Sequence, residues 1–251
     1  MFKASMSDAR LWKNLLSAIS TLIEEADFNA TADGIKLRAM DPSHVAMVDL
    51  EWKKTGFDEY QCDKPSTIRI NIESMLKLIK RIKSDETLEM NFNEETKEID
   101  FILKKKITKK FTMPTLTPAG EEVPTPKVEF NSTIKVAIGN FKEIMEDAQT
   151  VSDHVRLEAS VDKLVVKSSS ELGRVNIEVE KDSGILLDLN VKENSIATYN
   201  LNYLAEMVKA GSLLSETAIV EFSTNMPIKI DFEIPDKGNL IYYLAPRIEV
   251  E

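Results

Sequence analysis

Asp41, Ser43 and His44 lie within four consecutive positions of the stretch AMDPSHVAM, residues 39–47. An acid, a hydroxyl and an imidazole are the groups of a hydrolase triad, in which the imidazole lies between the nucleophile and the acid. Triad members usually come from separate segments, whereas these three share one Pro-containing turn. The chain also lacks the Gly-x-Ser-x-Gly turn that presents a nucleophilic serine. We therefore assign no catalytic residue, and a structural turn is the simplest interpretation.

Other catalytic and metal chemistry finds little support in the composition. A carboxylate-dependent hydrolase is the alternative raised by 42 acidic residues, but no acidic pair is singled out by its spacing. Cys62 is the only cysteine, and His44 and His154 are the only histidines. We therefore expect no zinc site of the usual Cys/His kind within one chain, no cofactor and no internal disulfide, as in a reducing cytosol.

The length and composition indicate a folded globular protein. The 251 residues are 43% hydrophobic and 29% charged, enough for one large domain or two modest ones. No apolar run reaches the roughly 18 residues of a membrane span, so we expect no membrane partner. The first ten residues, MFKASMSDAR, lack the apolar core of a signal peptide, which predicts a cytoplasmic location.

Hydrophobic periodicity predicts many strands and four helices. Apolar residues alternate along residues 35–39, 46–50 and 88–92, as in half-buried strands. Between such runs lie four stretches of helical period, at about 9–24, 72–83, 141–151 and 201–210.

The chain repeats itself at a shift of 129 positions. The shift places Trp12-Lys13-Asn14-Leu15-Leu16 on Phe141-Lys142-Glu143-Ile144-Met145, and Lys80 on Lys209. Few residues are identical, but apolar positions keep register across two helices and the strands between them. Chance agreement is the alternative, although it requires helix and strand periods to match in the same order. We predict two similar halves.

A proline-rich segment separates the halves. Four prolines fall within residues 114–126, where they remove backbone donors and fix φ. The segment is therefore expected to be an extended linker. The predicted organisation is an N-terminal domain at 1–113, a linker at 114–127 and a C-terminal domain at 128–251.

Positive charge gathers on the predicted helices although the net charge is −10. An acidic chain is a poor partner for nucleic acid if its charge is evenly spread. In the helix at 72–83, however, Lys77, Lys80 and Arg81 lie opposite the apolar side. Basic residues lie on the outer faces of the other helices too. One such face alone indicates only solvation; matching faces on repeated helices indicate a separate positive surface.

The turn within LRAMDPSHVAMVDL, the repeat, the linker and the ending YYLAPRIE together resemble the proliferating cell nuclear antigen family of sliding clamps, and most closely its archaeal members. The resemblance covers the whole chain in order. It implies an α+β fold of two similar DNA-clamp domains, each with two helices packed on antiparallel sheets. Three subunits then form a six-domain ring.

The resemblance also implies a function without catalysis. Duplex DNA threads the ring, independent of its sequence, and the ring tethers DNA polymerase, flap endonuclease and DNA ligase after a clamp loader has closed it. Such a protein lies in the nucleoid of the cytoplasm, or in the nucleus of a eukaryote. One subunit of a heterotrimeric clamp and a checkpoint clamp of the same fold remain alternatives.

Three sets of site residues follow by position. The DNA-facing candidates are Lys13, Lys77, Lys80, Arg81 and Lys209, with Arg10, Lys83 and Lys142 as secondary candidates. Near Lys142 the expected basic surface is interrupted by Glu146 and Gln149. A hydrophobic pocket for partners is expected from three segments: Met40, Asp41, Ser43, His44 and Val45; Val123 and Pro124; and Tyr242, Leu244, Ala245, Pro246 and Arg247. Glu121 and Glu122 make the linker wall more polar than in eukaryotic clamps.

The third set is a subunit interface between residues 104–113 of one chain and 172–180 of the next. Its first strand contributes Lys106, Ile107, Lys110 and Phe111, with Ile107 and Phe111 on one face. Its second contributes Val175, Ile177, Glu178, Val179 and Glu180, with the apolar residues on one face and the acids on the other. The alternative is that the lysines only protect an edge strand from aggregation.

Overall fold

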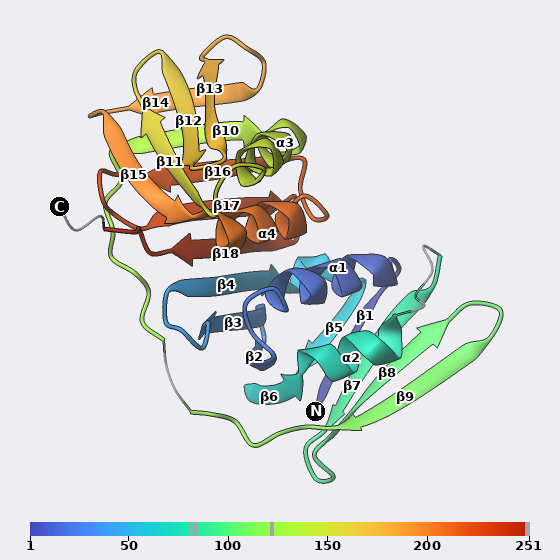
Figure 1. The fold of residues 1–251 in the computed structure, drawn as a ribbon. Coiled ribbons are helices and arrows are strands. Elements are labelled where there is room, and N and C mark those ends of the chain that lie inside the picture. The colour runs from blue at the N-terminus through green and yellow to red at the C-terminus, as the bar shows by residue number, and fades with distance from the viewer. Residues whose placement is uncertain (81, 83–84, 121–122, 249–251) are drawn as a thin grey trace. The chain divides into compact units, whose positions relative to one another are not determined.

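The computed structural model describes residues 1–80, 82, 85–120 and 123–248, and the statements below concern these residues (Figure 1). The four predicted helices are confirmed: α1 is Ala9–Ile19, α2 is Ile72–Ile79, α3 is Ile138–Gln149 and α4 is Leu201–Gly211. A 3₁₀ turn, η1, spans Lys54–Gly56. None of these helices is long and apolar enough to cross a membrane.

Several helix ends differ from the prediction, and α2 ends at Ile79 rather than at residue 83. α1 ends at Ile19 rather than near residue 24, because Ser20 and Thr21 donate their hydroxyls back to the carbonyl oxygens of Ser17 and Ala18, at 2.8 and 2.7 Å. Such local bonds compete with helix continuation. α3 begins at Ile138, three residues before the apolar period became visible, and its first turn contains Gly139.

Eighteen strands accompany the helices. In the first half they are β1 (Phe2–Met6), β2 (Glu25–Thr31), β3 (Gly34–Met40), β4 (Ala46–Lys53), β5 (Glu59–Cys62), β6 (Ser66–Asn71), β7 (Thr87–Asn93), β8 (Glu98–Lys104) and β9 (Thr108–Pro114). In the second half they are β10 (Ser132–Ala137), β11 (His154–Ala159), β12 (Lys163–Ser170), β13 (Gly173–Glu180), β14 (Leu186–Val191), β15 (Ser195–Asn200), β16 (Thr217–Phe222), β17 (Ile228–Ile234) and β18 (Gly238–Leu244).

The repeat at 129 positions is visible in these bounds. The shift carries β6 onto β15 without any offset and α1 onto the start of α3. Asn71 and Asn200, related by the same shift, both cap the helix that follows through a side-chain oxygen that accepts a backbone N–H. The two halves therefore share local structure as well as apolar period.

The chain divides into two compact units of the same topology. Unit 1 comprises residues 1–42, 48–123 and 234–240, and unit 2 comprises residues 43–47, 124–233 and 241–251. The strands of the first half follow the orders β5-β1-β7-β8-β9 and β4-β3-β2-β6, and those of the second half β14-β10-β16-β17-β18 and β13-β12-β11-β15. Each strand has the same neighbours as its counterpart. The α+β class with antiparallel sheets is thus confirmed.

Each unit builds its core between two helices and its strands. In Figure 1 α1 lies beside α2, and α3 beside α4, in front of the strands of their own unit. In unit 1 the indole of Trp12 packs edge-on against Trp52, with ring centroids 6.4 Å apart. In unit 2 Tyr199 of β15 and Phe222 of β16 make an edge-on contact, with ring centroids 6.5 Å apart. Burying these apolar faces turns the opposite helix faces to solvent.

Candidate functional site

The turn between β3 and β4 exposes its hydroxyl and imidazole but not its acid. Asp41 is 2% exposed, whereas Ser43, His44 and Val45 are exposed. His44 has a φ of 57°, in the left-handed region that His tolerates in tight turns. Met40, just before the turn, is also exposed. An exposed turn with an apolar residue at each end favours recognition over a reaction centre.

The C-terminal tail is tied to this turn within unit 2. The N–H of Ala245 donates to the carbonyl oxygen of Val45 at 2.8 Å, and the N–H of Arg247 donates to that of Thr198 at 2.7 Å. The structure therefore brings together Val45, Ala245 and Arg247, which the sequence analysis assigned to one partner-binding pocket. Ala245 and Arg247 are exposed, and Pro246 is half-buried.

Two other residues of that expected pocket belong to the core. Tyr242 and Leu244 are 0% and 1% exposed. The ring of Tyr242 packs edge-on against Phe232, with centroids 6.0 Å apart. Alternation along β18 explains the difference, since Tyr242 and Leu244 share the inward side of the strand. They support the tail rather than offer a surface.

The linker is held along unit 1 by three anchors. The carbonyl oxygen of Arg69 accepts the N–H of Leu116 at 2.8 Å. The carboxylate of Asp27 accepts the N–H of Ala119 at 3.0 Å. The guanidinium of Arg38 donates to the carbonyl oxygen of Val123 at 3.3 Å. Val123 is half-buried and Pro124 is exposed. These anchors fix where the linker crosses β6, β2 and β3, and Glu121 and Glu122 lie outside the described residues.

The sequence analysis missed these anchors. Asp27 and Arg69 lie directly opposite each other in β2 and β6 and form an ion pair at 3.1 Å. Arg38 pairs with Asp49 of β4 at 2.7 Å. Each pair joins residues that are distant in the chain, so no local pattern marks them; only the strand register does.

Of the candidate DNA-facing cations on the helices, Lys77 and Lys209 are exposed and Lys13 and Lys142 are half-buried, and most of them are paired. Lys77 forms an ion pair with Glu73 at 2.8 Å, and Lys209 forms one with Glu206 at 3.1 Å. Lys142 pairs with Glu146 at 3.6 Å. Exposed pairs of this kind are weak and exchange readily with other anions. The helix faces are therefore less positive than a count of lysines indicates.

Lys13 and Lys80 have a different environment. The ammonium of Lys13 donates to the carbonyl oxygen of Lys80 at 3.1 Å, at the end of α2, where a cation complements the helix dipole. The side chain of Lys80 is exposed, and among the residues that the structure describes it has no ion pair with a carboxylate. Arg81 and Lys83 lie outside the described residues.

Arg10 is engaged with the helix cap of α1. Asp8 accepts the backbone N–H of Arg10 at 3.0 Å and pairs with its guanidinium at 3.2 Å. Burial alone raises the pKa of Asp8, but the hydrogen bonds from Arg10 outweigh this and hold the pKa below its ordinary value. Asp8 thus stays ionised and offsets the charge of Arg10.

The two predicted interface segments are edge strands of their sheets. β9 ends the order β5-β1-β7-β8-β9, and β13 begins the order β13-β12-β11-β15. In β13 the apolar side chains and the acids lie on opposite faces, as expected: Val175, Ile177 and Val179 against Glu178 and Glu180. One free row of backbone N–H and C=O groups remains on each edge strand.

One detail of the interface prediction is wrong. Ile107 does not share a strand face with Phe111, because it lies in the turn between β8 and β9 and is 70% exposed. The lysines around it are paired within the chain: Lys110 with Asp100 at 2.9 Å, and Lys109 with Glu86 at 2.6 Å. Lys106 is exposed in the same turn.

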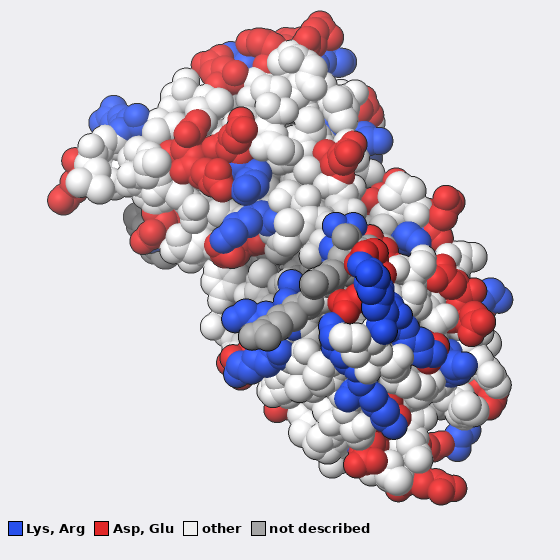
Figure 2. Space-filling model, turned by 90° about the vertical axis from the view of Figure 1, so that its right-hand side faces the viewer, with Lys and Arg blue, Asp and Glu red and all other residues white. Residues whose placement is uncertain are grey.

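Figure 2 turns the β8–β9 side of Figure 1 toward the viewer and shows a row of Lys and Arg in its lower half. Acidic side chains lie beside this row. Glu178 of β13 is likewise paired with Lys163; the hydrogen bonds from Lys163 and Asn176 hold its pKa below the ordinary value. Charge on both edges is thus partly balanced within one chain.

Comparison with known proteins follows the same division of the chain. The family model "Proliferating cell nuclear antigen, N-terminal domain" matches residues 1–117, and the corresponding C-terminal domain model matches residues 124–247. A "DNA polymerase sliding clamp" from Nitrosopumilus maritimus is 36% identical over 248 residues, 99% of each chain. A protein of the same name from Thermofilum pendens is 33% identical over 249 residues, 99% of this chain and 100% of that protein.

A solved structure agrees with these relatives. The crystal structure of PCNA from Thermococcus kodakaraensis superposes with a TM-score of 0.93 at 25% sequence identity. The match covers 98% of this chain and 100% of that chain. Sequence and fold therefore point to the same group of proteins.

Proposed function

The chain belongs to the proliferating cell nuclear antigen family and is a DNA polymerase sliding clamp, and we propose that it works as a ring of three copies around duplex DNA. Each copy contributes two domains, 1–113 and 128–251, joined by the linker 114–127. The supporting observation is the duplicated unit with exposed Lys80, the C-cap residue of α2, and exposed Lys209, in the last turn of α4, at matching positions of the repeat. Cations at repeated positions attract phosphates without reading bases.

Retention on circular DNA tests this proposal. A clamp closed by its loader around a nicked plasmid should co-elute with the plasmid in gel filtration and should be lost after the plasmid is linearised, because only a free end releases a ring. Equal retention on circular and linear DNA would contradict encirclement.

The electrostatic contribution has its own variants. Lys80→Glu combined with Lys209→Glu should reduce retention on the circle, and steeply so as salt rises, because fewer phosphate contacts remain. Glu73→Gln combined with Glu206→Gln removes the partners of Lys77 and Lys209 and should have the opposite effect. If the two double variants behave alike in the same retention measurement, the helix cations do not face DNA.

We further propose that the turn and the tail dock replication enzymes such as polymerase, flap endonuclease and ligase, and that the clamp itself catalyses no reaction. Support comes from the hydrogen bond that joins Val45 to Ala245 and from the exposed Met40 and Val45 nearby. Met suits such a surface because its side chain adapts to different partners.

The test replaces exposed rather than buried residues. Val45→Asp with Ala245→Asp places charges on the docking surface and should abolish stimulation of the polymerase, while sedimentation still reports an intact ring. Leu244 is left unchanged, because it is buried and its loss damages the core. Full stimulation by an intact double variant would remove the turn and the tail from the docking site.

A further inference from the structure

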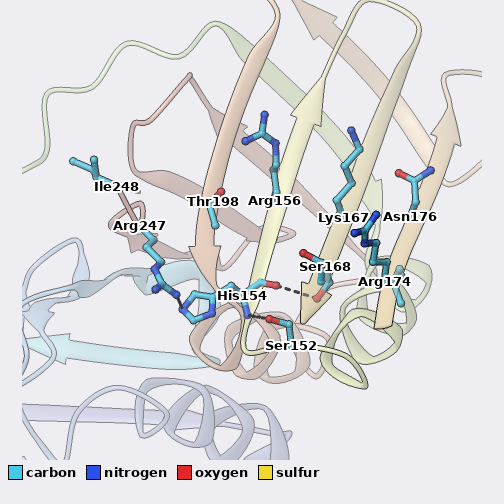
Figure 3. A pocket seen from close by; sticks show the side chains of 12 residues that line it. Ser152, His154, Arg156, Lys167, Ser168, Arg174, Asn176, Thr198, Arg247 and Ile248 are labelled. Carbon is cyan, nitrogen blue, oxygen red and sulfur yellow. Dashed lines mark hydrogen bonds between the residues drawn. The ribbon is translucent and has the colours of Figure 1, made fainter. Parts of the chain in front are cut away.

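A basic groove of about 1050 Å³ lies on the solvent-facing side of the four-stranded sheet of unit 2 (Figure 3). One row of residues crosses all four strands: Asn176 of β13 is opposite Lys167 of β12, Lys167 is opposite Arg156 of β11, and Arg156 is opposite Thr198 of β15. Arg247 of the tail continues the row, since its N–H bonds to Thr198.

The groove is positive in an otherwise acidic protein. Arg156, Lys167, Arg174 and Arg247 line it, and no Asp or Glu is among its described lining residues. Figure 3 shows the first three of these side chains on neighbouring strands and Arg247 directed toward His154. Over the described residues, Arg174 and Arg247 have no ion pair with a carboxylate.

A supporting carboxylate holds two of these cations side by side. Arg156 and Lys167 are cross-strand neighbours, and like charges in such positions repel. Glu158, on the strand of Arg156, accepts from Arg156 at 2.8 Å and from Lys167 at 2.7 Å. Burial by itself raises the pKa of Glu158, but these hydrogen bonds outweigh it and keep the pKa below its ordinary value. The groove retains a positive excess.

Unit 1 shows what the equivalent face holds. There the linker crosses β6, β2 and β3, held by its anchors at Arg69, Asp27 and Arg38. The repeat shift of 129 carries these three anchors onto three residues of the basic groove: Thr198, Arg156 and Lys167. The equivalent sheet face therefore carries the linker in unit 1 and forms an open groove in unit 2.

The C-terminal tail makes only the equivalent of the first of the three linker anchors. Its Arg247 N–H bonds to the carbonyl oxygen of Thr198, as the Leu116 N–H of the linker bonds to that of Arg69. The linker then reaches the second and third strands, whereas the described tail, through Ile248, reaches neither. The two middle cations, Arg156 and Lys167, face the groove instead of a peptide of the same chain.

We propose that the basic groove binds an extended acidic segment of a partner whose docking motif occupies the adjoining turn and tail. The proposal rests on the docking function proposed above and adds the chemistry of the sequence beside the motif. Four strands at about 4.8 Å spacing span roughly 14 Å, the length of about five extended residues. Arg247 belongs to both surfaces and joins them.

Labelled synthetic peptides test the groove by fluorescence anisotropy. One peptide carries only a docking motif of the kind that the resemblance to the clamp family implies for its partners, with a Gln, an aliphatic residue and two aromatic residues. Two others add six Glu residues before or after it, and their controls add six Gln residues. At low salt one Glu extension should bind roughly tenfold more tightly than its Gln control, since two or three exposed ion pairs form.

Groove variants should remove this gain alone. Arg156→Gln with Lys167→Gln should bring the Glu-extended peptide to the affinity of its Gln control and leave the motif peptide unchanged. Lys135→Gln with Lys192→Gln removes equal charge from exposed sites outside the groove and should preserve the gain.

The outcomes separate the two proposals. A motif peptide that does not bind at all overturns the docking site. A motif peptide that binds without any gain from either Glu extension overturns the groove. A single-stranded oligonucleotide that competes for the groove more strongly than the Glu extension overturns the peptide assignment in favour of nucleic acid.

Discussion

Gly211, at the end of α4, shows how closely the helices of this protein approach their sheets. A Cβ added at this position would lie 2.2 Å from ring carbons of Phe232, which is fully buried in β17. Phe232 in turn supports Tyr242, and Tyr242 lies in the strand that leads to the tail. A missing side chain at one position thus allows the packing behind the candidate docking surface.

Gly211→Ala should therefore destabilise the protein, by about 1–3 kcal/mol, because a well-packed core must shift to admit a methyl group. The melting temperature at fixed protein concentration measures this. Gly139→Ala is the matched control, since its added Cβ meets nothing within 4 Å and Ala favours helix. Equal melting temperatures for the two variants would show that the Phe232 ring yields without cost.

At the scale of elements, the linker depends on unit 1 for its course. Beyond Pro114, the last residue of β9, its described residues form no helix or strand, only a single bridge between Leu116 and Arg69. Its prolines prevent regular structure, and the anchors supply the direction that the linker lacks by itself. Asp27 serves twice, because one carboxylate oxygen accepts from Ala119 and the other pairs with Arg69.

Asp27→Ala should release the middle of the linker. Hydrogen–deuterium exchange at the Ala119 amide should accelerate about tenfold, since a hydrogen bond to a charged acceptor is lost. Glu25→Ala is the control: it removes the other carboxylate partner of Arg69, at 3.1 Å, but leaves the Ala119 contact. Similar exchange in both variants would assign the anchor to Arg69 rather than to Asp27.

At the scale of the whole molecule, ring closure needs two complementary edges. β9 and β13 are edge strands, and β13 carries an apolar row beside Glu178 and Glu180. Exposed ion pairs contribute only ~0–1 kcal/mol each. We therefore expect backbone pairing and apolar contact to hold the subunits, while charge selects the partner edge.

Glu178→Lys with Glu180→Lys should shift trimer toward monomer in sedimentation, because lysines then face the lysines of β9. Adding Lys106→Glu and Lys110→Glu should partly restore the trimer. Lys163→Gln is the control, since it breaks the internal pair with Glu178 without changing the charge of the proposed edge. A first double variant that stays trimeric at low protein concentration would rule out this edge pairing.

Local patterns in the sequence determined the elements of this protein and their repetition. Helix and strand periods depend on neighbours a few positions apart, so the four helices, the alternating strands and the shift of 129 were all visible without a structure. The turn at residues 39–47 and the ending YYLAPRIE likewise marked the family, because each motif is a continuous stretch.

Only the tertiary structure decided which side chains are exposed and which are already paired within the chain. Tyr242 and Leu244 are buried, Ile107 lies in a turn, and Lys77 is paired on its own helix. The linker anchors and the basic groove join residues from several strands that are far apart in the chain. Strand register brings them together, and register follows from burying one face of every strand at once, a condition that no short stretch of sequence expresses.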